Sequence, residues 1–145
     1  MTIDDYEAVF SLWQRISGLG IRKIDDSYDS IHRFLKRNPN ISVVAEKNGK
    51  LVGSILAGHD GRRANLYHVC VEDEFRRQGI GEAMVEQTLN AIKKENLTVV
   101  HLVAYTRNDI GNQFWQKIGW AKRDDLYYYD YPLKGNNNPR VKLDE

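Results

Sequence analysis

Cysteine is nearly absent from this chain, and so are long apolar runs and net charge. The single Cys70 excludes an internal disulfide and a cysteine-based metal site, and it suits a reducing compartment. The longest apolar stretches, 41–45 and 99–104, are far shorter than the roughly 18 residues of a membrane span. Because 21 Lys and Arg oppose 20 Asp and Glu, no overall field attracts nucleic acid or an anionic membrane. We therefore expect a cytoplasmic protein with neither as a partner.

The composition of the 145 residues is that of a globular protein. Hydrophobic residues make up 41% of the chain and charged residues 28%, which is too apolar and too charge-balanced for a disordered sequence. The length is typical of one domain. We expect a single domain over residues 1–133 and a loosely ordered tail over 134–145.

The first part of the chain shows helical periodicity. Apolar side chains recur every three or four residues and predict a helix over 3–17 and a shorter helix over 30–37. The stretch 17–29 has no sustained period and carries an acidic cluster of Asp25, Asp26 and Asp29. We interpret this stretch as a mobile loop whose acids are solvated, or attract a cationic amine.

Two dipeptides predict β-hairpins in the middle of the chain. Asn48-Gly49 and Asp60-Gly61 suit two-residue type I′ turns, which need positive φ angles. They separate three expected antiparallel strands, 41–47, 50–58 and 63–71.

The second half predicts a crossover and a further helix. A strong amphipathic pattern from Ile80 to Lys94 predicts a helix, and the strand expected over 99–105 would then run parallel to the third strand. A helix capped by Asn108 or Asp109 should end before Gly119. The segments 120–123 and 126–133 read as a final strand pair. Together these elements predict an α+β fold of α/β/α layers around a mixed, mostly antiparallel sheet.

The segment from Val71 to Gly81 is the most informative part of the sequence. It runs from a strand end through a basic turn with two glycines into the strong helix, and such a helix start offers unpaired N–H groups to a phosphate. The glycines alternatively only shape a tight turn. No Gly-Lys-Ser/Thr follows, so the turn is not a P-loop, and Met84 replaces the third glycine of a dinucleotide-binding fingerprint.

Two motifs resemble the GCN5-related N-acetyltransferase (GNAT) family. Arg76-x-x-Gly79-x-Gly81 is similar to the family's acyl-CoA pyrophosphate signature, and the segment 108–120, with Phe114 and Trp115, is similar to its second motif. The resemblance covers about residues 3–133. It implies a GNAT-type sheet in which the central parallel strands splay apart, and transfer of an acetyl group from acetyl-CoA to a primary amine by direct attack in a ternary complex.

The resemblance also implies a cofactor site. The diphosphate would lie on the loop and helix start, the pantetheine arm would pair with the third strand, and three residues of the second motif would contact the arm or the far end of the cofactor. The implied residues are Val69, Cys70 and Val71 on the strand, Arg76, Arg77, Gln78, Gly79, Ile80, Gly81 and Glu82 on the loop, and Asn108, Phe114 and Trp115 in the second motif. Asn108 is alternatively a plain helix cap, and the two aromatic residues alternatively make ordinary core contacts.

The sequence departs from the family at both proton-transfer positions. Trp115 stands where many members have a tyrosine acid, and Val103 stands where some have a glutamate base. An indole N–H does not serve as that acid. The candidates for proton transfer are therefore Glu46, His68, Tyr105 and Tyr128, although Glu46 also suits a solvated strand end and His68 a hydrogen-bonded core position.

Several further expectations follow. The four histidines lie on different elements without ligand spacing, so we expect no metal site. The family's first strand is missing or very short, which leaves a sheet edge that a second subunit or the tail would cover. A homodimer is therefore a candidate assembly. The acceptor is a small-molecule or peptide amine, and the alternative function is a non-catalytic acyl-CoA-binding or sensing module.

Overall fold

The computed structural model describes residues 1–134, so nearly all of the expected tail lies outside the described residues. The chain divides into two compact units, Met1–Leu102 and Val103–Glu145. The sheet and most helices belong to the first unit. Each unit is described by itself.

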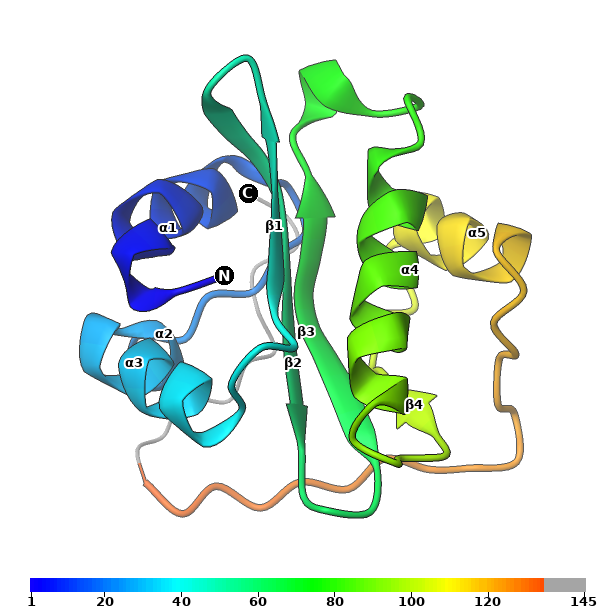
Figure 1. Ribbon diagram of the computed structural model, residues 1–145. Coiled ribbons are helices and arrows are strands. Elements are labelled where there is room, and N and C mark those ends of the chain that lie inside the picture. Colours follow the sequence, from blue (N-terminus) through cyan, green and yellow to red (C-terminus); the bar gives the residue numbers. More distant parts are fainter. Residues whose placement is uncertain (135–145) are drawn as a thin grey trace. The chain divides into compact units, whose positions relative to one another are not determined.

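Four strands form one mixed sheet in the first unit (Figure 1). The order is β1-β2-β3-β4; the first two pairings are antiparallel, and β3 pairs with β4 in parallel. This arrangement confirms the predicted mixed, mostly antiparallel sheet and its crossover. The strands are β1 (Val43–Lys47), β2 (Lys50–His59), β3 (Ala64–Val71) and β4 (Val100–His101).

Helices cover both faces of this sheet. In Figure 1, α1, α2 and α3 lie on one face, and α4 lies on the other. The layering is that of the predicted α/β/α fold. The helices of the first unit are α1 (Tyr6–Arg15), α2 (Lys23–Asp26), α3 (Tyr28–Arg37) and α4 (Ile80–Lys93), with the short 3-10 turns η1 (Ile3–Asp5) and η2 (Asp73–Phe75).

The main core lies between α1, α3 and the sheet. Tyr6, Val9, Leu12 and Trp13 recur at helical spacing on α1, and all four are buried. They form one cluster with residues of α3, β2 and β3. Burying such side chains contributes roughly 1.5–3 kcal/mol each, which explains why this face of α1 stays on the sheet.

Two glycines of β2 let helices approach opposite faces of the sheet. A Cβ at Gly53 would lie 2.9 Å from Met84 Cε on α4, and a Cβ at Gly58 would lie 2.8 Å from the Phe34 ring on α3. Because successive residues of a strand face opposite sides, this odd and even pair packs two different layers. Nearly all of β2 is buried as a result.

The N-terminal elements differ from the prediction in detail. The helix expected over 3–17 is η1 followed by α1, and it ends where Ile16 adopts extended angles. The expected mobile loop over 17–29 instead contains α2 and the start of α3. The reason is Asp26, whose buried carboxylate accepts a hydrogen bond from Arg22 N at 2.7 Å and closes the turn.

The two hairpins differ in how well they follow the prediction. Asn48 and Gly49 both have positive φ, as a two-residue type I′ turn requires. The second turn is not of this kind: its loop is four residues long, since His59 pairs with Ala64. The Asp60 carboxylate accepts hydrogen bonds from the N–H groups of residues 62 and 63, and this stabilises the longer loop.

The second unit contains α5 (Asp109–Lys117) in its described part. Asn108 caps this helix, because its side-chain oxygen accepts from Gly111 N at 3.1 Å, and Gly119 follows the helix with φ +94°. Within 103–134 there are no strands, so the expected strand pair 120–123 and 126–133 is wrong, and the strand expected over 99–105 shrinks to β4. The side chains of 121–134 are exposed, and an isolated strand pair without a packed face is marginal in water.

The edge strand β1 has β2 as its neighbour in the sheet, and no strand precedes α1 in the described chain. This confirms that the family's first strand is missing. The Met1 ammonium donates to Ser42 O at 2.9 Å, just before β1, so the N-terminus holds the beginning of the edge strand.

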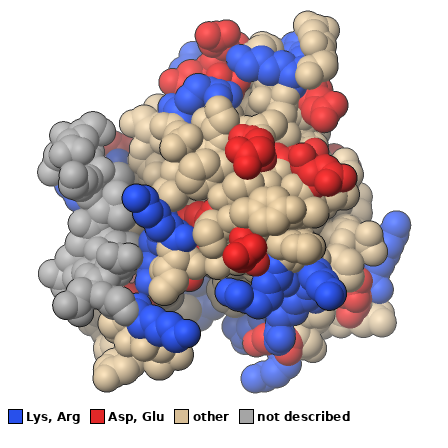
Figure 2. Space-filling model, turned by 90° about the vertical axis from the view of Figure 1, so that its left-hand side faces the viewer, with Lys and Arg blue, Asp and Glu red and all other residues tan. Residues whose placement is uncertain are grey.

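The charged side chains on the surface are mixed, and the helices of the described chain lack membrane-spanning character. On the face shown in Figure 2, acidic and basic side chains are interspersed, and neither sign covers the face alone. None of the helices in residues 1–134 is long and apolar enough to cross a membrane.

Candidate functional site

The segment between β3 and α4 is a compact loop that ends in a left-handed turn. After η2 the chain passes through Arg77 at φ +60° and Gly79 at φ +81°, and α4 begins at Ile80. Gly79 tolerates this angle because it has no Cβ. The predicted strand, glycine turn and helix start are therefore all present.

The unpaired main-chain N–H groups of this loop indicate an anion-binding site. Ala83 N donates to Gly79 O at 3.0 Å, which is the first hydrogen bond of α4. Within residues 1–134, the six preceding N–H groups, from Arg77 to Glu82, donate to no protein acceptor. A helix start carries roughly half a positive charge, so these donors favour a phosphate group.

The side chains of the loop have distinct roles. Arg76 does not extend into solvent as a free donor: its Nε donates to Val71 O at 3.1 Å, and its Nη2 lies 2.9 Å from Asp73 Oδ1. It therefore holds the loop closed. Arg77 is exposed, and Gln78 accepts a hydrogen bond from Lys47 Nζ at the tip of the β1–β2 hairpin. Lys47 thus brings a second positive charge to the loop.

Glu72 connects the loop to α1 and β2. Its carboxylate lies 3.0 Å from Arg15 Nε and 3.2 Å from Lys50 Nζ, and its N–H donates to Val52 O at 2.8 Å. Burial opposes ionisation, but the hydrogen bonds and charges of Arg15 and Lys50 outweigh it and hold the pKa of Glu72 below its ordinary value. The loop is therefore anchored by an ionised carboxylate.

One side of β3 lacks a strand partner near this loop. Within the first unit, β4 pairs only with Ala64 and Asn65, so the stretch from 66 to 71 has no neighbour on that side. Val69, Cys70 and Val71, predicted to pair with a pantetheine arm, lie in this stretch. Cys70 itself is buried, and burial raises the pKa of its thiol.

His68 lies at a bulge in β3. The pairings of Ser54 with Cys70 and of Leu56 with Tyr67 leave two β3 residues opposite Ile55, and His68 adopts φ +49°. Bulges re-aim side chains and are frequent beside active sites. Here the bulge directs the imidazole toward α1 and α2.

His68 is held by contacts from three elements, of which α1 and α2 reach its ring. Its Nε2 lies 2.8 Å from Asp26 Oδ1, and its ring centroid lies 4.5 Å from that of Trp13. Trp13 Nε1 donates to Ser54 Oγ at 2.9 Å, and Ser54 Oγ donates to the His68 carbonyl at 3.0 Å. The other strand candidate, Glu46, is an exposed residue at a register shift of β1.

The remaining predicted site residues belong to the second unit. Asn108 is engaged as the cap of α5. The rings of Phe114 and Trp115 contact each other edge to face, with their centroids 5.0 Å apart. Trp115 also packs on Trp120, at a centroid distance of 4.7 Å. Tyr105 is partly exposed, and Tyr128 is 71% exposed.

Sequence reasoning missed three functional candidates. In the sequence Asp26 is one of several loop acids, and no pattern singled out Lys47 or Glu72. Lys47 adjoins the Asn48-Gly49 turn, which places it at a hairpin tip, and the glutamate directly follows β3; these positions were the available signal. Nothing in the sequence separates Asp26 from Asp25 and Asp29.

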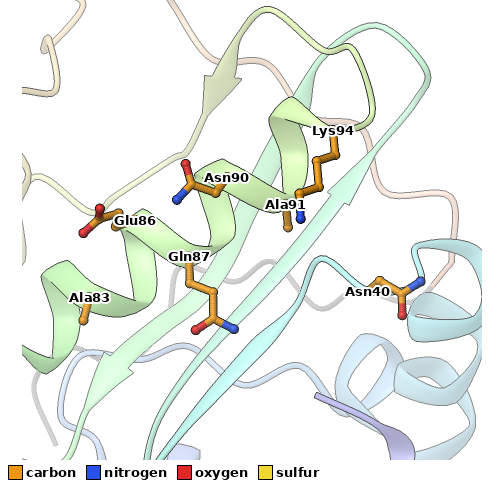
Figure 3. Close-up of a pocket in the computed structure, with 7 residues that line it drawn as sticks. All are labelled: Asn40, Ala83, Glu86, Gln87, Asn90, Ala91 and Lys94. Carbon is orange, nitrogen blue, oxygen red and sulfur yellow. The ribbon is translucent and has the colours of Figure 1, made fainter.

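A separate hollow of about 430 Å³ lies along α4 (Figure 3). Its lining is mainly polar and includes Asn40, from the segment between α3 and β1. Residues 1–134 contain no group of three or more His, Cys, Asp or Glu side chains able to hold a metal ion. The other residues of the hollow are Ala83, Glu86, Gln87, Asn90 and Ala91 on α4, and Lys94 directly after it.

Comparisons with known sequences agree on one family. The model of the acetyltransferase (GNAT) family matches residues 6–120. A protein of Pectobacterium atrosepticum named as an acetyltransferase is 33% identical over 121 residues, covering 83% of this chain and 84% of the relative. An acetyltransferase of Sodalis glossinidius is 30% identical over 123 residues and 85% of each chain.

Solved structures show the same fold. Ard1 from Thermoplasma volcanium superposes with a TM-score of 0.71 at 25% identity, covering 82% of this chain and 78% of the other. The PaiA N-acetyltransferase of Thermoplasma acidophilum, solved with coenzyme A, has a TM-score of 0.73 at 17% identity, with coverages of 86% and 88%.

Proposed function

Because this chain belongs to the acetyltransferase (GNAT) family, we propose that it transfers the acetyl group of acetyl-CoA to a primary amine by direct attack in a ternary complex. Family membership makes the protein an acyl-CoA-dependent acetyltransferase. The observation that supports the cofactor site is the run of six main-chain N–H groups, from Arg77 to Glu82, that have no acceptor within residues 1–134.

The diphosphate of acetyl-CoA would lie against these N–H groups. The donors Arg77, Gln78, Gly79, Ile80, Gly81 and Glu82 surround the positive end of α4, and the exposed Arg77 guanidinium adds a charge-assisted donor. Arg76 contributes indirectly, since it fixes the shape of the loop. Lys47 supplies long-range attraction from the hairpin tip.

The pantetheine arm would extend along the unpaired side of β3. Main-chain groups of Val69 and Cys70 are the proposed partners, and the Val71 carbonyl already accepts from Arg76 Nε. An arm that starts at the diphosphate loop and runs toward Val69 brings its thioester end close to the bulge. A main-chain N–H there would polarise the thioester carbonyl.

Asn108, Phe114 and Trp115 are proposed to contact the cofactor arm or its far end. The cap role of Asn108 uses its side-chain oxygen and leaves its side-chain N–H₂ group as the donor for that contact. Tyr105 and Tyr128 are proposed as acids for the leaving thiolate, and Glu46 and His68 as bases for the amine. The contacts of His68 favour it over the exposed Glu46.

The proposed acceptor is a small-molecule amine or a protein α-amine. Fold neighbours include the aminoglycoside acetyltransferase AAC(6')-Iy, solved with a bisubstrate analogue. Because Val103 replaces the glutamate base that some family members have, amines that deprotonate easily are favoured. Losing the proton at pH 7 costs a lysine-like amine about 4–5 kcal/mol and an α-amine about 1–1.5 kcal/mol. A cytoplasmic location and a domain spanning residues 1–133 are proposed with this activity.

An isosteric charge change tests the diphosphate site. Gln78→Glu adds one negative charge beside the unpaired N–H groups and keeps the size of the side chain. We expect acetyl-CoA to bind at least about tenfold more weakly, because one added charge near a phosphate costs roughly 1–4 kcal/mol at 4 Å. Calorimetry measures the dissociation constant, and the shift in Tm with acetyl-CoA gives a second reading.

The matched control is Gln87→Glu. It makes the same change about two turns into α4, in the separate hollow. We expect its affinity for acetyl-CoA to equal that of the unmodified protein. Equal affinities for both variants would contradict the proposed diphosphate site.

Binding without release of thiol against a broad amine panel would favour the non-catalytic module, which the residues Val103 and Trp115 suggest.

A further inference from the structure

The bulge of β3 fixes the main chain of His68 where the thioester is proposed to end. The carbonyl of His68 accepts a hydrogen bond from Ser54 Oγ at 3.0 Å. Ser54 Oγ in turn accepts one from Trp13 Nε1 at 2.9 Å. A non-glycine residue at positive φ persists when its surroundings determine it strongly. His68 directly precedes Val69, where the proposed path of the pantetheine arm ends.

The side chain of His68 is held as firmly as its main chain. Asp26 is buried, with 7% of its side chain exposed, and its two carboxylate oxygens are both engaged, Oδ1 by His68 Nε2 and Oδ2 by Arg22 N. The Tyr6 hydroxyl donates to the Asp26 carbonyl at 2.8 Å and fixes this segment of main chain. Trp13 packs against the imidazole from α1.

This geometry determines the tautomer of the neutral imidazole. An ionised carboxylate only accepts hydrogen bonds, so Nε2 carries the proton and donates it to Asp26. The lone pair then lies on Nδ1, which makes no hydrogen bond within the described chain. Because 16% of the His68 side chain remains exposed, the ring is not sealed in the core.

We propose that Asp26 is a positioning residue that holds His68 in the tautomer whose Nδ1 accepts the proton of the acceptor amine. The inference rests on the proposed acetyl transfer. His68 Nδ1 takes one proton from the ammonium form of the acceptor, and the freed amine attacks the thioester carbonyl. A C–N bond forms and the C–S bond breaks. The second nitrogen proton neutralises the departing thiolate, and the proton on Nδ1 returns to water.

Few other groups around Asp26 and His68 change charge between about pH 5 and 8. Burial, together with the charges of Glu7 and Asp26, raises the pKa of Tyr6, and burial raises the pKa of Cys70. Both therefore stay protonated below pH 8. Arg22 pairs with Asp25 at 3.2 Å on the outer side of α2. Histidine is the side chain that ordinarily titrates between about pH 5 and 8.

The test compares kcat/KM as a function of pH for three variants. The acceptor should be an amine with a pKa above about 9.5, so that its own titration falls outside the range. In Asp26→Asn the new side-chain amide can donate to His68 Nε2, so the imidazole proton moves to Nδ1. We expect kcat to fall at least about 10²-fold, with an unchanged KM for acetyl-CoA. The kcat of His68→Gln should fall by a similar factor, and its pH profile should lose the ascending limb.

Asp25→Asn is the matched control, because it removes a neighbouring carboxylate that is 60% exposed and pairs with Arg22. We expect its kcat and pH profile to match those of the unmodified protein. If Asp26→Asn and His68→Gln fold, retain kcat within threefold and keep the ascending limb, the inference is wrong although acetyl transfer stands. If the unmodified protein neither binds acetyl-CoA nor acetylates any amine, the proposed function itself fails.

A measurement on the unmodified protein removes dependence on the folding of variants. Long-range ¹⁵N NMR correlations distinguish the two neutral tautomers of an imidazole. We expect the His68 proton on Nε2 above neutral pH. A His68 proton on Nδ1 would overturn the assignment, whatever the variants show.

Discussion

At the scale of single residues, the site depends on charged groups that are engaged with other parts of the fold. Arg76 closes the loop, Glu72 ties it to α1 and β2, and Asp26 orients an imidazole from the facing helix layer. In each case one side chain satisfies partners on two or more elements. A substitution there therefore acts on the geometry of the site as well as on stability.

Glu72 allows a prediction about acid stability. Its pKa is lower in the folded protein than its ordinary value, so its contribution is fully present above that ordinary value and is lost as the pH falls through the folded one. We expect Glu72→Gln to lower the free energy of unfolding at pH 7 by about 1 kcal/mol, since both partners are partly exposed. Urea unfolding at pH 7 and pH 3 measures the difference.

The stability difference between the two proteins should shrink as the pH is lowered from 7 to 3, because the Glu72 carboxylate loses its charge as the pH falls through its lowered pKa. Glu86→Gln, on the exposed side of α4, is the control and should leave the free energy of unfolding unchanged at both values. A Glu72→Gln deficit that persists unchanged at pH 3 would contradict the ion-pair explanation.

At the scale of elements, local signals were reliable where the chain itself satisfies its polar groups. The first hairpin turn, the cap of α5 and the start of α4 were all predicted from a few adjacent residues. Predictions failed where the partner is distant in sequence. The amphipathic period could not show that α2 would form, because the Asp26 carboxylate that accepts from Arg22 N is also held by His68 on β3, 42 residues away.

The cap of α5 leads to a prediction for this nine-residue helix. Asn108→Ala removes the acceptor of the Gly111 N–H group, and we expect a loss of about 1 kcal/mol in helix stability. Asn108→Asp should retain the stability, because aspartate caps equally well. Amide hydrogen exchange in residues 109–117 measures both effects.

Acetyl-CoA affinity separates the two proposed roles of Asn108. The Asp variant keeps the cap but loses the side-chain N–H₂ group, so weaker binding in this variant would support a contact with the cofactor. Unchanged affinity in Asn108→Asp would leave the residue as a helix cap and contradict that contact. Loss of protection from exchange in both variants would contradict the capping explanation.

At the scale of the whole molecule, the sheet has an edge at β1 that the missing first strand would otherwise cover. The N-terminal ammonium contacts only the main chain just before this strand, at Ser42. Unpaired strand edges favour association with another chain. We propose that two copies pair through β1.

Light scattering with size-exclusion chromatography tests this assembly. We expect a mass of twice 16.8 kDa for the full chain and a correspondingly dimeric mass for a chain that ends at residue 133. The shortened chain should also keep its Tm and its thiol-release activity, since the proposed domain ends there. Monomeric masses for both chains, or a dimer lost on shortening, would contradict pairing through β1.

The sequence by itself determined the order of the main helices and strands, the mixed sheet and the glycine turn that begins α4. These features follow from periodicity and from residues such as Asn48, Gly49 and Gly79 that act on their own stretch of main chain. Only the tertiary structure decided which acid of the 17–29 stretch is buried against His68, and that Arg76 closes the loop from within. Both depend on contacts made in three dimensions, where the cost of burying a charge selects one partner among several that look alike in the sequence.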